Sequence, residues 1–105
     1  MKALIITWEK FQDHEVIYPY YRLLEEGFEV DIMSNVLGRF HGILGTNMES
    51  DLLTSDLNDP EKATAYLREY DFLVIPGGVK ALEKLRQERG VLRFCLLYTS
   101  DAADD

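Results

Sequence analysis

The sequence contains few of the residues that would tie it to disulfides, metals, nucleic acid or lipid. Cys95 is the only cysteine among 105 residues, so there is neither a disulfide framework nor a cysteine zinc motif. Lys and Arg number 11 against 19 Asp and Glu, and the net charge of -8 argues against a nucleic-acid partner. No apolar run approaches the roughly 20 residues of a membrane span, and the first residues lack a signal-peptide layout. We therefore expect a cytoplasmic protein that contacts neither nucleic acid nor membrane.

The most informative stretch of the chain is residues 71–78, with the sequence DFLVIPGG. Its apolar run between an aspartate and Pro-Gly-Gly predicts a short strand buried on both faces, as in a parallel sheet. Pro76 cannot donate a hydrogen bond to a neighbouring strand, and Gly77 and Gly78 permit a tight turn. Ligands of open α/β sheets bind at this carboxyl end of the strands.

The other predicted elements alternate between strands and helices. Residues 3–7 are apolar and rich in β-branched side chains, which predicts a central strand. Apolar spacing predicts a helix over 16–24 that ends at Gly27, with Pro19 either bending the helix or marking its proper start. Asp13 is a candidate cap for this helix. The remaining predictions are a strand at 27–34, a small β excursion at 38–53, a helix from 58–61 to Tyr70, a helix at 82–88 and a last helix from about 88 to 94.

This order of elements predicts one domain with an α/β fold, a three-layer α/β/α sandwich around a parallel sheet. Domains of this class reach roughly 150 residues, so we expect the later strands to be missing and apolar surface to be exposed on the strands that carry Ile5 and Val74. Residues 95–105, CLLYTSDAADD, resemble the translated end of a sequencing adaptor, although a natural disordered acidic tail is an alternative. We therefore assign the domain to residues 1–94 and set 95–105 aside as a non-native tail.

Two features at the predicted ligand end are candidates for chemistry. The amides of Gly77 and Gly78 could stabilise an oxyanion, or Pro-Gly-Gly could be a plain turn. Glu15, in an irregular first helical turn, could orient a nucleophile, or it could be a solvated charge favoured by the helix dipole. His14 and His41 have no carboxylate or cysteine at a useful spacing, so we predict that both are surface residues.

Four segments, taken in order, resemble the amino-terminal half of the PfpI (DJ-1/PfpI) family: MKALII at 1–6, FQDHEVIYP at 11–19, LEEGFEV at 24–30 and FLVIPGG at 72–78. The resemblance implies a flavodoxin-like sheet that is truncated before the nucleophile elbow, the sharp strand-to-helix turn that carries the family's cysteine. It also implies that Glu15 is the glutamate that hydrogen-bonds this cysteine, and that Gly78, with Gly77, supplies the amides that face it.

The resemblance further implies a cysteine-dependent enzyme, either a glyoxalase or deglycase or a hydrolase, that acts on small carbonyl compounds or peptides. Such an enzyme needs no cofactor and forms a homo-oligomer when it is full length. Gln12 stands where many members have Glu, which argues against a peptidase-like variant. Cys95 cannot replace the elbow cysteine, because Leu96 and Leu97 follow it in place of histidine and no placed charge would lower its pKa. We therefore expect this chain by itself to be inactive.

Two other functions remain open at this point. A non-catalytic, chaperone-like or regulatory member of the same family would lack the elbow cysteine in its full-length gene. An unrelated flavodoxin-like binding module is the second alternative. A receiver domain would need an aspartate at the end of the 72–75 strand, whereas Asp71 lies at its start. Bulky, charged residues at 8–10 do not suit the phosphate loop of a flavin site.

Overall fold

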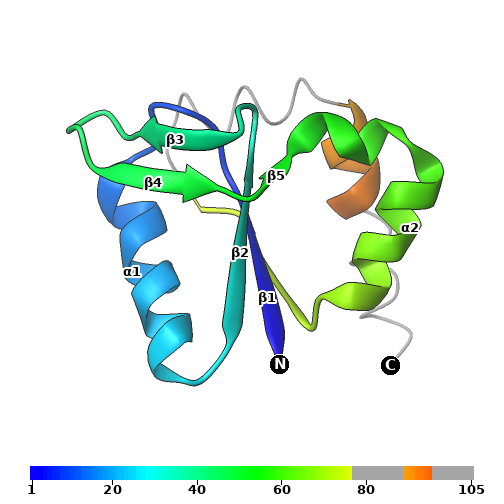
Figure 1. The fold of residues 1–105 in the computed structure, drawn as a ribbon, viewed down its shortest axis with the longest axis horizontal. Helices are drawn as coiled ribbons and strands as arrows, with labels where there is room; N and C mark the ends of the chain where they lie inside the picture. Colours follow the sequence, from blue (N-terminus) through cyan, green and yellow to red (C-terminus); the bar gives the residue numbers. More distant parts are fainter. Residues whose placement is uncertain (77–88, 96–105) are drawn as a thin grey trace.

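The chain folds around one parallel sheet with helices on both faces (Figure 1). The structure is a computed structural model that describes residues 1–76 and 89–95. The strands lie in the order β5-β2-β1-β6, and each neighbouring pair is parallel. Their bounds are Lys2–Ile6 for β1, Glu29–Ser34 for β2, Leu52–Leu53 for β5 and Phe72–Val74 for β6. Helix α1 (Asp13–Glu25) covers one face, and α2 (Pro60–Glu69) with a helix at 89–95 covers the other. The predicted α/β fold is confirmed.

Strand β1 forms the centre of the fold because its side chains serve both faces of the sheet. Leu4 and Ile6 belong to the core on the α2 side, and Ile5 belongs to the core on the α1 side. None of the three has any exposed surface. The expectation of exposed apolar surface on this strand is therefore wrong, since helices cover it from both sides. Strand β6 differs, because its Phe72 is 49% exposed and its Leu73 and Val74 are only partly buried. The strand itself is present, but the prediction that it is buried on both faces is wrong.

Helix α1 runs unbroken across Pro19, so the prediction that it starts properly only at that proline is wrong. The proline removes one backbone hydrogen bond, to the carbonyl of Glu15. Packing of the apolar side of the helix, where Val16 is fully buried, outweighs that loss. Consequently Glu15 lies in a regular first turn and not in an irregular one. The helix ends before Gly27 as predicted, and the φ of 87° at that residue is one that glycine adopts without strain.

The predicted β excursion is present, and its first part is an antiparallel hairpin of β3 (Gly38–His41) and β4 (Asn47–Ser50). It lies over the α1 side of the sheet, where the rings of Phe40 and Phe11 pack edge to face with centroids 5.3 Å apart. The chain then returns to the main sheet through β5, which pairs with the end of β2. Sequence reasoning placed these two residues in the β excursion but missed their pairing with the main sheet, because two residues are too few to show a strand pattern.

A short 3-10 helix, η1 (Thr54–Asn58), leads into α2, whose N-terminus is capped as the sequence predicts. The carboxylate of Asp59 accepts a hydrogen bond from the Glu61 amide at 3.0 Å. The last predicted helix is present at 89–95 and includes Cys95. Its Gly90 packs so closely on η1 that an added Cβ would lie 2.9 Å from the Asn58 nitrogen. The helix predicted at 82–88 lies outside the described residues, and the division at residue 94 stays a prediction.

Candidate functional site

A groove of about 690 Å³ opens at the carboxyl end of the sheet, between the start of α1 and the end of β6. It is lined by His14, Glu15, Ile17, Tyr18, Pro19, Val74, Ile75 and Pro76. The two elements meet there because β6 runs parallel to β1, and β1 leads into α1. The fold therefore brings Glu15 to the same groove as Pro76, the residue that precedes Gly77. Gly77 and Gly78 themselves lie outside the described residues.

The Glu15 side chain is exposed at the first turn of α1, where the helix dipole favours a negative charge. Within residues 1–76 and 89–95, no hydrogen bond or ion pair engages its carboxylate. Its neighbours in the groove on the β6 side are the apolar Val74, Ile75 and Pro76. The carboxylate can therefore accept a hydrogen bond from a group that enters the groove. His14 in the groove and His41 on β3 are both exposed, as predicted.

Cys95 lies in a different part of the molecule from Glu15. It packs against the core cluster on the α2 face of the sheet, whereas Glu15 belongs to the helix on the opposite face. Burial raises the pKa of the Cys95 thiol above its ordinary value of 9.0. The thiol is accordingly held protonated near neutral pH, and the fold does not bring it to the groove.

Asp13 has a role that sequence reasoning missed. It is only 4% exposed, and the N-cap position of α1 belongs to Gln12, which makes no side-chain cap. The Asp13 carboxylate instead accepts hydrogen bonds from the backbone amides of Leu44 at 2.9 Å and Thr46 at 3.0 Å. A hydrogen bond from the Thr46 side chain contributes most to lowering the pKa of the Asp13 carboxyl, and the two amide bonds add to it. Together they lower this pKa from 3.8 to about 2. No local signal could have shown this, since the partners lie 31 and 33 residues away.

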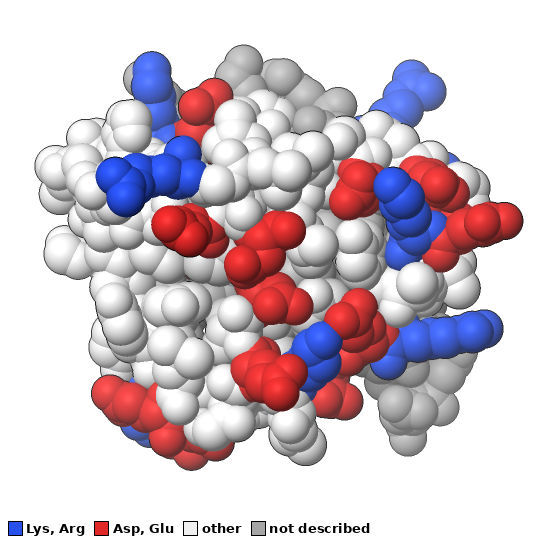
Figure 2. Space-filling model, in the orientation of Figure 1, with Lys and Arg blue, Asp and Glu red and all other residues white. Residues whose placement is uncertain are grey.

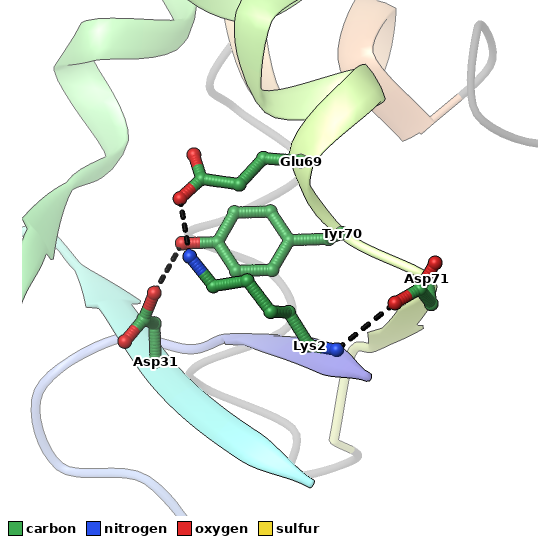
Figure 3. Close-up of polar contacts among 5 residues, drawn as sticks. All are labelled: Lys2, Asp31, Glu69, Tyr70 and Asp71. Atoms are coloured by element: carbon green, nitrogen blue, oxygen red, sulfur yellow. Dashed lines mark hydrogen bonds and ion pairs between the residues drawn. The ribbon is translucent and has the colours of Figure 1, made fainter.

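The amino end of the sheet carries a polar network that ties four elements together (Figure 3). The Tyr70 hydroxyl donates to Asp31 at 2.5 Å, and the Lys2 ammonium pairs with Glu69 at 2.5 Å. The Lys2 amide donates to Asp71 at 3.0 Å. Burial, together with the bond to Asp31, raises the pKa of Tyr70. Each of these polar groups is already used by another, so the network is structural.

A second hollow, of about 500 Å³, lies between α1, β2 and the hairpin. Figure 2 shows that carboxylates gather in the middle of this face of the molecule. Two of the hollow's acids already serve the structure, since Asp51 accepts from the Ile32 amide at 2.9 Å and Asp31 accepts from Tyr70. Within the described ranges, no group of three or more acids, histidines or cysteines is placed to hold a metal ion. No helix there is long and apolar enough to cross a bilayer.

Comparison with known proteins identifies the family. The model of the DJ-1/PfpI family matches residues 1–100. The chain belongs to the DJ-1/PfpI family. A deglycase of Pyrococcus horikoshii is 45% identical over 86 residues, which cover 82% of this chain and 46% of that protein. The deglycase PfpI of Pyrococcus furiosus is 41% identical over 86 residues, with the same coverage of 82% and 46%. The chain thus spans about half the length of these curated relatives.

Solved structures of DJ-1/PfpI proteins share the fold. A two-domain protein from Anabaena variabilis, with DJ-1/ThiJ/PfpI-like and ferritin-like domains, superposes with a TM-score of 0.78 at 27% identity. The match covers 95% of this chain and 27% of that one. Oxidized DJ-1 of Toxoplasma gondii superposes with a TM-score of 0.75 at 22% identity, and the match covers 95% of this chain and 50% of that one. The second likeness shows the fold alone. Family membership removes the unrelated binding module from consideration.

Proposed function

We propose that this chain supplies the glutamate side of the active site of a DJ-1/PfpI-type cysteine-dependent enzyme. The observation that carries the proposal is the place of Glu15, which lines a groove at the carboxyl end of the sheet with Val74 and Pro76. The similarity to two Pyrococcus deglycases supports the reaction class. The proposed enzyme is a glyoxalase or deglycase, or a related hydrolase, whose substrates are small carbonyl compounds or peptides.

The groove suits chemistry in which a thiol attacks a carbonyl carbon. A thiol placed beside Glu15 would donate a hydrogen bond to its carboxylate, which would hold the sulfur in one direction. As the sulfur bonds to the carbon, the thiol proton would pass to the Glu15 carboxylate, and the carbonyl oxygen gains negative charge and needs hydrogen-bond donors. The proposed donors are the backbone amides of Gly78 and Gly77, which follow the end of β6. No cofactor takes part in this scheme.

We propose further that residues 1–105 are inactive by themselves. The only cysteine is Cys95, and it packs on the other face of the sheet with a raised pKa. A thiol held protonated is a weak nucleophile. Loss of the nucleophile removes nearly all the acceleration that such a site provides.

The experiment compares the chain as given with a fusion of residues 1–94 to the carboxyl-terminal half of the Pyrococcus horikoshii deglycase. Consumption of methylglyoxal is measured for each protein. We expect no turnover above background for residues 1–105, with or without Cys95→Ser. The fusion should turn over, and Glu15→Gln should reduce its kcat/KM. Glu25→Gln, a neutralised carboxylate in the last turn of the same helix, is the matched control and should leave kcat/KM unchanged.

Three outcomes would count against this proposal. Activity of residues 1–105 that Cys95→Ser abolishes would show that Cys95 is a nucleophile after all. A folded fusion that is equally active with Glu15 and with Gln at that position would remove Glu15 from the site. A full-length gene product without an elbow cysteine would favour the non-catalytic, chaperone-like or regulatory alternative. The resemblance also implies a homo-oligomer, and sedimentation of the same preparations measures the oligomeric state.

A further inference from the structure

We propose that Asp13 is a positioning residue that fixes the first turn of α1, and with it the direction of Glu15. It does so by holding the 42–46 loop, the connection between β3 and β4, against the start of the helix. The inference rests on the proposed function, because Glu15 is the residue that Asp13 positions.

The contact between Asp13 and the loop uses both carboxylate oxygens. Oδ1 accepts from the Leu44 amide at 2.9 Å, and Oδ2 accepts from the Thr46 amide at 3.0 Å. Asp13 is almost fully buried, with only 4% of its surface exposed to solvent. Charge-assisted hydrogen bonds away from water are stronger than neutral ones and hold their partners in one geometry. Asp13 thus acts as a two-point clamp on the loop.

Backbone contacts around Asp13 make the loop and the helix start a single packed unit. The Ile43 amide donates to the Phe11 carbonyl at 2.9 Å, and the Lys10 amide donates to the His41 carbonyl at 2.8 Å. At Gly42 an added Cβ would lie 2.7 Å from Oδ1 of Asp13 and 2.8 Å from the Phe11 oxygen. Only glycine leaves room for this approach. In Figure 1 the connection between β3 and β4 lies beside the start of α1.

The clamp and Glu15 lie on opposite sides of the same helical turn. Residues two positions apart in a helix are rotated by about 200° about the helix axis, so their side chains point to nearly opposite sides. Asp13 faces the hairpin, so Glu15 faces away from it, toward the groove beside Val74 and Ile75. A rotation or shift of the first turn would therefore move both side chains together. Since catalytic groups lose much of their effect when displaced by about 1 Å, the clamp bears on catalysis without touching substrate.

The test uses NMR of residues 1–105 at neutral pH. Asp13→Asn keeps the shape of the side chain but replaces one acceptor with a donor, and Asp13→Glu keeps the charge but lengthens the arm. In both variants we expect hydrogen exchange of the Leu44 and Thr46 amides to become roughly tenfold faster. We also expect the side-chain carbon signals of Glu15 to change.

Asp51→Asn is the matched control, because Asp51 also accepts a backbone amide, that of Ile32 at 2.9 Å, just beyond the other end of the hairpin. This variant should leave the Glu15 signals unchanged. If the Asp13 variants fail to fold, Thr46→Val removes one side-chain contribution to the clamp and should produce the same changes at smaller size.

Three results would overturn the inference. Faster exchange at Leu44 and Thr46 with unchanged Glu15 signals would show that Asp13 only secures the loop. A change at Glu15 in Asp13→Asn but not in Asp13→Glu would be an effect of charge and not of position. Unchanged exchange in every variant would remove the clamp. These NMR readouts need no turnover. If the Asp13 variants change the Glu15 signals but the fusion's activity does not depend on Glu15, the proposed function is rejected and the positioning role of Asp13 stands.

Discussion

The two ends of the parallel sheet use their charged side chains in opposite ways. At the amino end the carboxylates are taken up by neighbouring groups: Asp31 by the Tyr70 hydroxyl, Glu69 by the Lys2 ammonium and Asp71 by the Lys2 backbone amide (Figure 3). At the carboxyl end, the Glu15 carboxylate lines a groove, and no part of the chain that the structure describes bonds to it. Polar groups that satisfy one another stabilise a fold, whereas an unused carboxylate in a groove is available to a ligand.

The difference follows from the direction of the chain. At the amino end, α2 passes directly into β6 through Tyr70 and Asp71, so these side chains are pressed against β1 and β2. At the carboxyl end, strands lead into loops and into the first turn of α1, where backbone amides and the helix dipole favour anions. Substitutions at the amino end should therefore change stability, and a substitution of Glu15 should change activity.

The largest expected effect is that of Glu15→Gln on the active fusion. We expect kcat/KM to fall by about 10²-fold or more, the size typical of a group that assists proton transfer. The free energy of unfolding should change by less than about 0.5 kcal/mol, because Glu15 is exposed and none of the described residues bonds to its carboxylate. Enzyme assays and urea unfolding of the same preparations measure the two quantities. A loss of stability that matches the loss of activity would erase the contrast between the two ends.

Tyr70→Phe should have the reverse effect. The substitution removes the hydroxyl that donates to Asp31 and leaves that carboxylate without this partner. We expect a loss of about 1 to 2 kcal/mol in urea unfolding, because hydrogen bonds to charged groups contribute more than neutral ones. Tyr66→Phe, one turn earlier at the end of α2, is the control, and it should cost less because the Tyr66 bond to Asp56 is longer, at 3.3 Å. Equal losses in the two variants would contradict this ranking.

Alkaline pH should weaken the polar network at the amino end. Burial raises the pKa of Tyr70 above its ordinary value of 10.0, so the folded state favours the neutral phenol. The stability that Tyr70 contributes is therefore complete below pH 10 and is lost as the pH rises toward the folded-state pKa. Unfolding free energies measured from pH 8 upward should fall more steeply for the wild type than for Tyr70→Phe. Parallel curves would show that Tyr70 titrates normally.

The smallest expected effect belongs to Glu69→Gln. Its partner Lys2 has a raised pKa, chiefly because of the hydrogen bond from its ammonium to Glu69. Both side chains are partly exposed, at 33% and 40%, and solvent screens such a pair. We expect a small decrease in Tm that disappears when salt is added. A large, salt-resistant decrease would mean that the ion pair contributes as much as the Tyr70 bond.

Local patterns account for the elements that were predicted correctly. The apolar run of β1, the strand before Pro76 and the Asp-Pro start of α2 are each specified by adjacent residues. The errors occurred where distant contacts outweigh a local rule. Pro19 is tolerated inside α1 because the helix packs on the sheet, and Ile5 is buried because helices cover both faces. Neither contact appears in the residues next to these positions.

The same division holds for the candidate site. The sequence by itself determined the α/β class, the family resemblance and the choice of Glu15, because hydrophobic periodicity and short motifs are written in neighbouring residues. The sequence also predicted that Glu15 lies at the same end of the sheet as the end of β6, and both line one groove. Only the tertiary structure decided that Cys95 lies on the opposite face of the sheet. It alone also showed that Asp13 binds the hairpin loop and does not cap its own helix. These facts depend on side chains more than 30 residues apart meeting in space, and chain spacing alone does not encode such meetings.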